Sequence, residues 1–426
     1  MAAGNVDFRT CNYTTARDPR VILLEDMDQF EVQVFEAYHQ RGFPRVVVNY
    51  AGLITAVSYE AKKLGINRDA TPRAQDALKI CRNLILIQQP QDADIKLKEA
   101  SYKIRLAVDS VLQSLNPPPV FQYSSPDESY IDITAYIDSM EERYGYDNLV
   151  HQDLKYWENC SQEVRLIYGS LIGARIIKKI LQATNYQSSI GIGCNKSIAK
   201  IGSALHKPGS ITILAPTGLQ QFAEFVKIEG ISGLGGKLGD VIKHKFGVET
   251  MLDLQNVRHV RLAKTVTFNG NWIGYEKATV ILNKAYGLCD DEVVPIKYAS
   301  TATVSHQFYG HTFTRTQYMT EILELYVDKM LERLHFEKRN HNRTPTTLKF
   351  SIFLTNRNNI HAKLENVMWH EINNKGKMID SFGYDNTSII PQYWDKNAQV
   401  DKVQIVAKFA DNPTQVYAVS AFSFMF

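Results

Sequence analysis

The sequence contains few cysteines, and none of them is paired at a metal-binding spacing. Its five cysteines are scattered among 426 residues and never form a C-x-x-C pair. This usage argues against a disulfide framework and a zinc site, and predicts reduced thiols in a cytosolic or nuclear setting. No apolar run approaches the roughly 18 residues that a membrane-spanning helix needs. Residues 1–20 are too polar for a secretory signal, so no membrane partner is expected.

Internal repeats and low-complexity tracts are also absent. Hydrophobic residues make up 44% of the chain, which favours a packed globular protein over a disordered one. The length exceeds what one simple core accommodates and predicts about two to four domains. The net charge of +3 is compatible with a nucleic-acid partner but is too small to identify one.

Strand-like and helical segments alternate along the chain and predict an α+β multidomain fold. The expected strands are 21–28, 44–50, 53–59, 120–123, 129–134, 188–195 and 211–214. The expected helical segments are 30–42, 60–115 with breaks near Pro72 and Pro90, 136–184, 196–207 and short pieces of 249–287. Residues 293–301 suggest a linker, after which strands surround one good helix at 316–336.

Two segments about 100 positions apart place carboxylates at a strand end or a tight turn. VILLEDMDQF (21–30) ends in acids that include Asp26, and SSPDESYID (124–132) carries Asp127 and Glu128 in its turn. Mg²⁺ prefers oxygen ligands, and two such ions can activate the attacking oxygen and stabilise the leaving oxygen of a phosphoryl transfer. Acids also commonly cap strands and turns, so the pattern alone leaves both interpretations open.

Five segments, in this order, resemble motifs of the Y-family DNA polymerases and come closest to the eta branch. They are VILLEDMDQFEVQV (21–34), AVSYEAKKLGINR (56–68), SSPDESYID (124–132), SIGIGCNKSIAK (189–200) and ISGLGGKLG (231–239). The resemblance implies template-directed DNA synthesis past damaged bases, without proofreading. It also implies a right-hand fold: a ferredoxin-like palm (1–29 and 94–225), small fingers (30–93), a helical thumb (226–294), a linker (295–304) and an α+β little finger (305–426).

The same resemblance assigns roles to individual residues. Asp26, Asp127 and Glu128 would hold two Mg²⁺ ions, with Mn²⁺ as a substitute and the Met27 carbonyl as a further ligand. Asp28 is expected to cap the following helix. Tyr59, Lys62 and Lys196 would hold the triphosphate, and Glu31 takes the position under the sugar. Arg68 would contact the incoming base or its phosphates, Asn49 would lie near the template base, and Phe30 is a further expected nucleotide-binding residue.

Lysine at position 62 replaces the arginine usual in the family, so the charge remains but the bidentate fork is lost. The glycine turn at Gly235 and Gly236 would bring backbone N–H groups to a DNA phosphate. The expected basic contacts to the DNA backbone are Lys237, Lys243, His244 and Lys245, followed by Lys338, Arg339, His341, Arg343 and Lys349. The alternative for the turn at Gly235 and Gly236 is an ordinary glycine-rich turn. The alternative for the basic residues from Lys338 to Lys349 is a solvated charge run.

One departure from the family concerns the position under the nucleotide sugar. Glu31 stands where the family has an aromatic gate, and Phe35 stands where it has glutamate. Three interpretations remain open: the Phe35 ring refills the gate from one turn away, the gate is lost, or the site is inactive. We favour an active polymerase with altered sugar selection.

Two other functions remain as rivals: a non-catalytic DNA-binding or scaffold protein, and a different Mg²⁺ nucleotidyl-transfer enzyme. The expected partners are primer–template DNA and deoxynucleoside triphosphates. A sliding clamp, if one binds, would use a region outside this chain. A monomer in the nucleus is expected.

Overall fold

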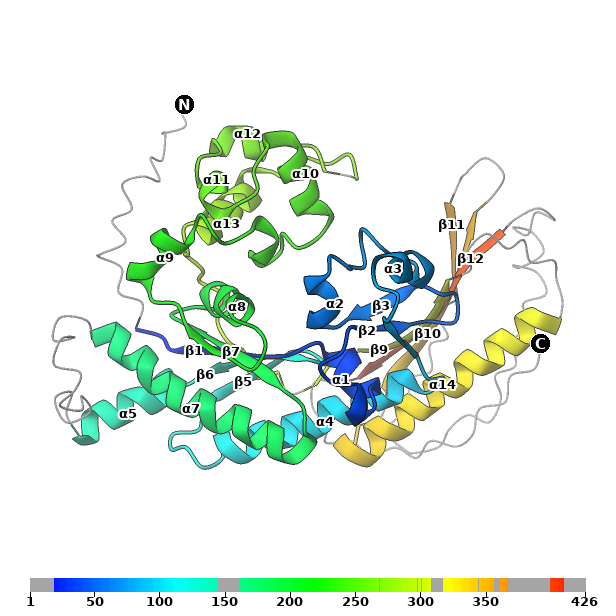
Figure 1. Ribbon diagram of the computed structural model, residues 1–426, viewed down its shortest axis with the longest axis horizontal. Coiled ribbons are helices and arrows are strands. Elements are labelled where there is room, and N and C mark those ends of the chain that lie inside the picture. Colours follow the sequence, from blue (N-terminus) through cyan, green and yellow to red (C-terminus); the bar gives the residue numbers. More distant parts are fainter. Residues whose placement is uncertain are drawn as a thin grey trace. The chain divides into compact units, whose positions relative to one another are not determined.

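The computed structural model has a mixed α/β fold in two units, Met1–Lys297 and Tyr298–Phe426 (Figure 1). It describes residues 19–144, 161–267, 269–296, 298–299, 301–307, 317–343, 345–355, 361–366 and 399–409. Within these ranges, no helix is long and apolar enough to cross a bilayer.

Five strands form the central sheet of the first unit, in the order β5-β6-β1-β7-β8. Their bounds are β1 Ile22–Met27, β5 Val120–Ser125, β6 Glu128–Asp132, β7 Ser188–Gly193 and β8 Ile211–Ile213. β1 pairs antiparallel with β6 and β7, whereas β8 runs parallel to β7. The strands expected in these segments are therefore confirmed, and the two acidic segments lie side by side in the sheet.

Helices cover both faces of this sheet (Figure 1). α4 (Ala93–Leu112) and α7 (Ser161–Thr184) pack on one face, and α8 (Lys196–Leu205) packs on the other. α8 approaches β7 so closely that a Cβ at Gly191 would lie 1.9 Å from the Ala199 carbonyl oxygen. Glycine is therefore required there, and it fixes the position of α8 over the sheet.

A smaller three-stranded sheet, in the order β3-β2-β4, follows β1 in the chain. It comprises β2 Arg45–Val48, β3 Ile54–Val57 and β4 Ile85–Gln88, with helices α1 Phe30–Phe35, α2 Tyr59–Lys63 and α3 Ala74–Ile80. The helix expected over 30–42 ends early, at Phe35, and is followed by a 3-10 turn, Tyr38–Gln40. The segment from 60 to 115 was expected to be helical with breaks near Pro72 and Pro90. The strand β4, which pairs parallel with β2, was not expected there.

The remainder of the first unit is mostly helical. α5 spans Thr134–Tyr144, and residues 145–160 of the expected long helix lie outside the described part. After β8 come α9 Pro216–Phe222, α10 Lys237–Phe246, α11 Met251–Gln255, α12 His259–Ala263 and α13 Tyr275–Ala285. Apolar side chains from α10 to α13, such as Ile242, Leu254, Leu262 and Leu282, form one buried core. The short helices expected over 249–287 are confirmed.

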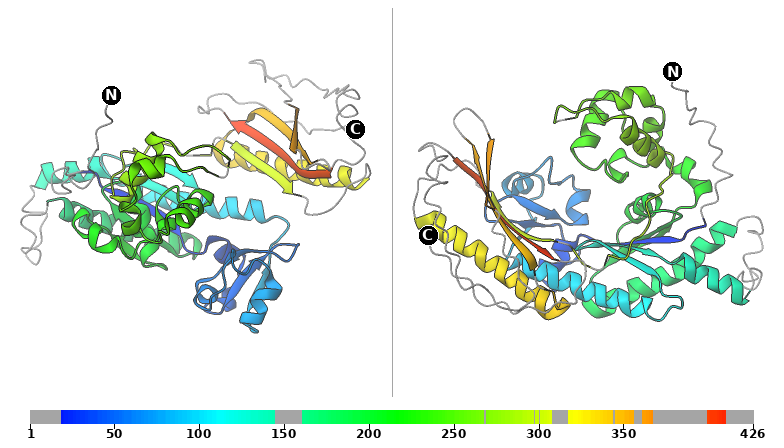
Figure 2. Two further views of the ribbon diagram at one scale, coloured as in Figure 1. Left: turned by 90° about the horizontal axis from the view of Figure 1, so that it is seen from above. Right: turned by 180° about the vertical axis from the view of Figure 1, so that it is seen from behind.

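The second unit contains a four-stranded antiparallel sheet and one long helix, α14, which runs along the sheet (Figure 2). The elements are β9 Thr301–Gln307, α14 Gln317–His341, β10 Pro345–Thr355, β11 His361–Asn366 and β12 Gln399–Phe409. Met330 and Leu334 of α14 pack on Val304, Ile405 and Ala407 of the sheet. This unit therefore has its own hydrophobic core.

Candidate active site

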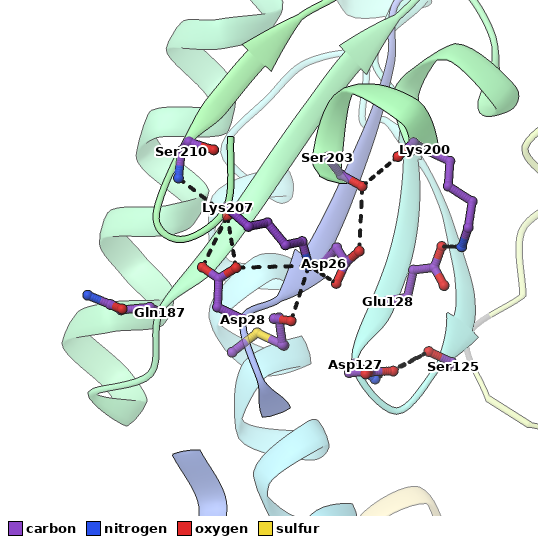
Figure 3. Close-up of polar contacts among 12 residues, drawn as sticks. Asp26, Asp28, Ser125, Asp127, Glu128, Gln187, Lys200, Ser203, Lys207 and Ser210 are labelled. Atoms are coloured by element: carbon purple, nitrogen blue, oxygen red, sulfur yellow. Dashed lines mark hydrogen bonds and ion pairs between the residues drawn. The ribbon is translucent and has the colours of Figure 1, made fainter. Parts of the chain in front are cut away.

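Two acidic side chains face each other across neighbouring strands of the central sheet. Asp26 of β1 and Glu128 of β6 are register partners, and their side chains therefore project from the same face. Along β1, Ile22 and Leu24 alternate with residues of the opposite face and pack with Ala199 of α8. Asp26 continues this alternation, so both carboxylates face the side that α8 covers (Figure 3).

A lysine is paired with each of these acids. Lys207 Nζ forms an ion pair with Oδ1 of Asp26, and Lys200 Nζ forms one with Oε1 of Glu128 (Figure 3). The Ser203 hydroxyl adds a long hydrogen bond of 3.5 Å to Oδ2 of Asp26. Burial raises the pKa of Asp26, while Lys207 acts in the opposite direction. The lysines thus balance negative charge that is partly removed from water.

Asp127 lies at the turn between β5 and β6 but does not join the other two acids. Its carboxylate accepts a 2.6 Å hydrogen bond from the Ser125 hydroxyl, while its carbonyl accepts one from the Met27 N–H. In the part of the chain that the structure describes, no three acidic, histidine or cysteine side chains converge as a metal site. The donors are hard oxygens on adjoining strand ends, which suits Mg²⁺ by chemistry. Their side-chain orientations would have to change for all three to bind together.

Sequence reasoning missed Lys207 and Lys200. Lys207 Nζ also lies 3.4 Å from the Met27 carbonyl oxygen, so it contacts two of the predicted metal ligands. A topological signal for it exists, since β8 runs parallel to β7 and antiparallel to β1. The turn that precedes β8 must therefore lie at the end of β1, where Asp26 is found.

Asp28 was predicted to cap α1, and this was wrong. The N-cap of α1 is Gln29, in the left-handed conformation (φ 43°, ψ 50°). The buried Asp28 carboxylate instead accepts hydrogen bonds from the Tyr59 hydroxyl (3.0 Å), the Ser189 hydroxyl (3.0 Å) and the Gly209 N–H (2.7 Å). It is therefore a junction between α2, β7 and the turn before β8.

Tyr59 and Lys62 lie on the first turn of α2, although Tyr59 was expected at the end of the preceding strand. The helix begins because the Ser58 hydroxyl accepts a hydrogen bond from the Ala61 N–H. Lys62 Nζ lies 5.1 Å from the centre of the Tyr59 ring. Burial lowers the pKa of Lys62, and the positive charges of Lys207 and Arg68 lower it further. α2 and the turn before β8 thus form one positive region beside the acids.

Lys196 belongs to a different group of charges. Its ammonium lies 5.5 Å from the centre of the Tyr130 ring, and burial lowers its pKa. Asp291 acts to raise this pKa and Arg20 acts to lower it further. Tyr130 is the register partner of Leu24, further back along β1 from Asp26. Lys196 is therefore not grouped with Tyr59 and Lys62, with which the sequence had placed it.

The remaining residues predicted near the nucleotide have internal contacts. The Arg68 guanidinium donates to the Thr55 carbonyl at 3.2 Å, and Phe30 is buried in the core under the central sheet. The Asn49 side-chain oxygen accepts from the N–H groups of Ala51 and Leu53, both at 3.0 Å. Asn49 therefore shapes the turn between β2 and β3.

Glu31 and Phe35 point to different neighbours. The Glu31 carboxylate accepts a 3.0 Å hydrogen bond from the Thr55 hydroxyl of β3. The Phe35 side chain packs with Val32, Val47 and Ile87 on the smaller sheet. This packing does not support the interpretation in which the Phe35 ring refills the position of Glu31.

In the first unit, the predicted DNA contacts lie at both ends of α10. Gly236 is the N-cap and Lys237 the first helical residue, and Gly235 precedes them. Lys243, on the last turn, forms ion pairs with Glu229 (2.8 Å) and Glu249 (3.1 Å). A DNA phosphate would have to compete with these two acids for Lys243.

In the second unit, Arg343 is not a surface residue. It is only 8% exposed, pairs with Glu337 at 3.2 Å and lies over the Phe409 ring, 4.3 Å from its centre. The prediction that Arg343 contacts DNA is corrected, because its charge is satisfied inside the fold. Arg339 is exposed at the end of α14. The Lys349 backbone lies in β10 opposite Val406, and its side chain lies outside the described part.

Comparison with known proteins finds one matching family model and several related DNA polymerases. Residues 25–204 match the impB/mucB/samB family. DNA polymerase eta of Arabidopsis thaliana is 29% identical over 335 residues, which cover 68% of this chain and 49% of that protein. DNA polymerase eta of Drosophila melanogaster is 27% identical over 344 residues, 68% of this chain and 37% of that protein. DNA polymerase IV of Francisella tularensis subsp. holarctica is 28% identical over 321 residues, 74% and 78% respectively. The chain spans about half, or less, of the two eta relatives.

Proposed function

We propose, from the match of residues 25–204 to the impB/mucB/samB family, that the chain is a template-directed DNA polymerase that copies past damaged bases. The observation that carries the proposal is the cross-strand pair Asp26 and Glu128 beside the cations Lys62 and Lys207. Nucleotidyl transfer requires acids that hold metal ions next to cations that hold phosphates. Both kinds of group come together here: Asp26, Lys62 and Glu128 lie within the matched residues, and Lys207 lies three residues beyond them.

The right-hand layout is part of the proposal. The central sheet with α4, α7 and α8 serves as the palm (1–29 and 94–225), and the smaller sheet with α1 to α3 serves as the fingers (30–93). The helical region (226–294) is the thumb, and a linker (295–304) leads to the little finger (305–426). The two units of the fold, which divide at residues 297 and 298, support a boundary inside that linker.

We further propose that two Mg²⁺ ions are held by Asp26, Asp127, Glu128 and the Met27 carbonyl. When bound, such ions lower the pKa of an attacking hydroxyl and stabilise the charge on the leaving phosphate. Asp127 would have to turn away from Ser125 to take part. Oxygen donors on two adjoining strands, with no cysteine or histidine among them, support a hard cation such as Mg²⁺.

The nucleotide would lie against the positive region. Lys62, Lys207 and the Tyr59 hydroxyl would hold the triphosphate, with Arg68 nearby. In the reaction, the primer 3′-hydroxyl gives up its proton to water, its oxygen bonds to the α-phosphorus, and pyrophosphate leaves with the electron pair of the broken P–O bond. Positioning and electrostatic stabilisation would supply most of the rate, because no covalent intermediate is needed. Lys196 is reassigned to a separate place beside Tyr130.

A primer-extension assay with Mg²⁺, on undamaged and dimer-containing templates, tests the function. The wild type should extend both, Asp26→Ala should lose extension, and so should the pair Asp127→Ala with Glu128→Ala. Glu142→Ala, an exposed acid on α5, is the matched control. A wild type that binds primer–template DNA without extending it would favour the scaffold alternative. Unchanged extension by the site variants would refute the mechanism.

Substrates and location follow from the same proposal. Primer–template DNA and deoxynucleoside triphosphates are the proposed substrates of a monomer. The plant and insect eta relatives support a nuclear location, while the bacterial relatives give it no support. Imaging of the tagged protein in its own cells would test this, and exclusion from the nucleus would contradict it.

A further inference from the structure

The ammonium group of Lys207 contacts the oxygen atoms that the proposed cation would need. It is ion-paired with Oδ1 of Asp26 and lies 3.4 Å from the Met27 carbonyl oxygen and 3.9 Å from Oδ1 of Asp28 (Figure 3). The side chains of Lys207 and Asp26 are only 15% and 23% exposed. Water therefore screens this pair less than an ordinary surface ion pair.

The other two acids of the site are held in a similar way. Lys200 of α8 pairs with Glu128, and the Ser125 hydroxyl donates to Asp127. Three side chains from three elements thus give each acid an internal partner. A divalent cation that binds Asp26 must first displace the Lys207 ammonium, because both require the same oxygens.

We propose that Lys207 competes with the divalent cation at Asp26 and Met27, and that the triphosphate of the nucleotide releases it. Cation and nucleotide then bind cooperatively, and the cation alone binds weakly. The inference rests on the proposed function and adds a coupling between its two ligands. It makes Lys207 a residue that moves between a carboxylate and a phosphate.

The surroundings of Lys207 indicate where its ammonium can go. Asp28 cannot readily draw it away, since its oxygens already accept from Tyr59, Ser189 and Gly209. On the other side, Lys62 and Arg68 lie within electrostatic reach of each other, and Lys207 contributes to the lowered pKa of Lys62. A phosphate arriving among these cations would relieve their repulsion and offer Lys207 a new anionic partner.

Thermodynamic linkage makes the effect of the nucleotide on cation affinity equal to the effect of the cation on nucleotide affinity. The factor by which the nucleotide raises cation affinity must equal the factor by which the cation raises nucleotide affinity. Coupling between sites of this kind is typically about 5- to 150-fold. Because the nucleotide would release a partly buried ion pair, we expect a coupling factor on the order of tenfold for this chain.

The test measures Mn²⁺ binding by electron paramagnetic resonance on the whole chain without DNA, alone and with a non-hydrolysable deoxynucleoside triphosphate. The nucleotide should tighten Mn²⁺ binding to the wild type on the order of tenfold. Lys207→Met should bind Mn²⁺ more tightly than the wild type without nucleotide, and most of the coupling should disappear. Lys207→Arg keeps the charge and should behave like the wild type. Lys179→Met, an exposed lysine on α7 across the sheet, is the control.

The outcomes separate this inference from the proposed function. Equal Mn²⁺ affinity of the wild type and Lys207→Met without nucleotide would overturn the exchange and leave the metal site standing. Failure of every variant to bind Mn²⁺, even with nucleotide, would refute the metal site itself. If Lys207→Met does not fold, the wild type still decides, because absence of coupling between Mn²⁺ and nucleotide overturns the inference.

Discussion

The Tyr59 hydroxyl donates a 3.0 Å hydrogen bond to Oδ1 of Asp28. This bond joins the first turn of α2 to the residue that follows β1. The same carboxylate accepts from the Gly209 N–H, two residues after Lys207. Asp28 therefore sets the distance between the two elements that carry the proposed phosphate-binding cations, although it belongs to neither of them.

Removal of the Tyr59 hydroxyl should weaken nucleotide binding more than it slows turnover. Tyr59→Phe leaves a buried carboxylate with one donor fewer, at a cost of about 1 kcal/mol. A cost of about 1 kcal/mol corresponds to a factor of about five in affinity. We therefore expect the nucleotide KM to rise about fivefold while kcat changes less. Single-nucleotide incorporation gives both constants, and Tyr275→Phe, on the exposed side of α13, is the control. An unchanged KM in a folded variant would contradict the role of this bond.

Glu25 should make the stability of the protein fall as the pH rises. Its side chain is buried, one oxygen accepts a 2.9 Å hydrogen bond from Ser129, and the other has no hydrogen-bond partner. Burial raises the pKa of Glu25 from 4.5 to about 8. Between these values the folded state holds a proton that the unfolded chain has lost, so stability declines from about pH 4.5 to about pH 8 and then levels off.

Glu25→Gln removes this dependence, because its amide is neutral throughout. One pKa unit corresponds to about 1.4 kcal/mol, so the variant should gain a few kcal/mol over the wild type between pH 5 and pH 8. Urea unfolding in EDTA at several pH values measures the difference. Glu142→Gln, on an exposed acid, should run parallel to the wild type. Parallel curves for Glu25→Gln would show that Glu25 is ionised in the fold.

Glu31 should determine how the protein treats the 2′-hydroxyl of a nucleotide. Its carboxylate is held by Thr55, and Phe35 packs elsewhere, so the Phe35 ring does not replace it. We expect ready incorporation of ribonucleotides, and we expect Glu31→Phe to restore discrimination. The ratio of kcat/KM for deoxy- and ribonucleotides measures this. Thr55→Val, which frees the carboxylate without adding a ring, should not restore discrimination. An equal ratio for the wild type and Glu31→Phe would refute the idea.

The sequence predicted the elements of the site better than their contacts. The strand that carries Asp26, the turn at Asp127 and a helical segment that starts near residue 60 are local patterns, and all three were found. The bond from Gly209 to Asp28 crosses 181 positions, and only the order of strands in the sheet brings it about. Periodicity carries no information on such a contact, which explains why Asp28 was taken for a helix cap.

The same limit applied to charge. Arg343 and Arg339 lie in one basic run, and no pattern in that run distinguishes them. Burial separates them, because Arg343 is enclosed by Glu337 and Phe409 while Arg339 remains exposed. β4 was missed for a related reason. By sequence alone its four residues resemble part of a helix, and it is the pairing with the parallel strand β2 that makes them a strand.

Arg343→Met should destabilise the second unit without a specific effect on DNA affinity. It removes the Arg343 partner of the buried Glu337 carboxylate, which costs about 3 kcal/mol or more. Arg339→Met should change stability by less than about 0.5 kcal/mol but weaken DNA binding and reduce its salt dependence. Urea unfolding and binding isotherms at several salt concentrations measure both. A smaller salt slope for Arg343→Met than for Arg339→Met, with full stability, would reverse the assignment.

Two glycines at the start of α10 should differ sharply in tolerance. A Cβ at Gly239 would lie 1.8 Å from the Leu234 carbonyl oxygen, whereas a Cβ at Gly236 would meet nothing within 4 Å. Gly239→Ala must therefore push the helix away from the preceding turn. We expect a loss of several kcal/mol, in the range of a disrupted core.

Gly236→Ala should cost no more than about 1 kcal/mol, as expected for alanine at an N-cap. Thermal unfolding compares the two variants, and DNA binding at low temperature asks whether the turn itself is recognised. If the backbone at Gly236 approaches a phosphate, Gly236→Ala should bind DNA less tightly while remaining as stable as this estimate allows. Undiminished DNA binding by Gly236→Ala would show that the turn has a structural role only. In that case glycine would be required only at position 239, because the helix and the turn pack closely there.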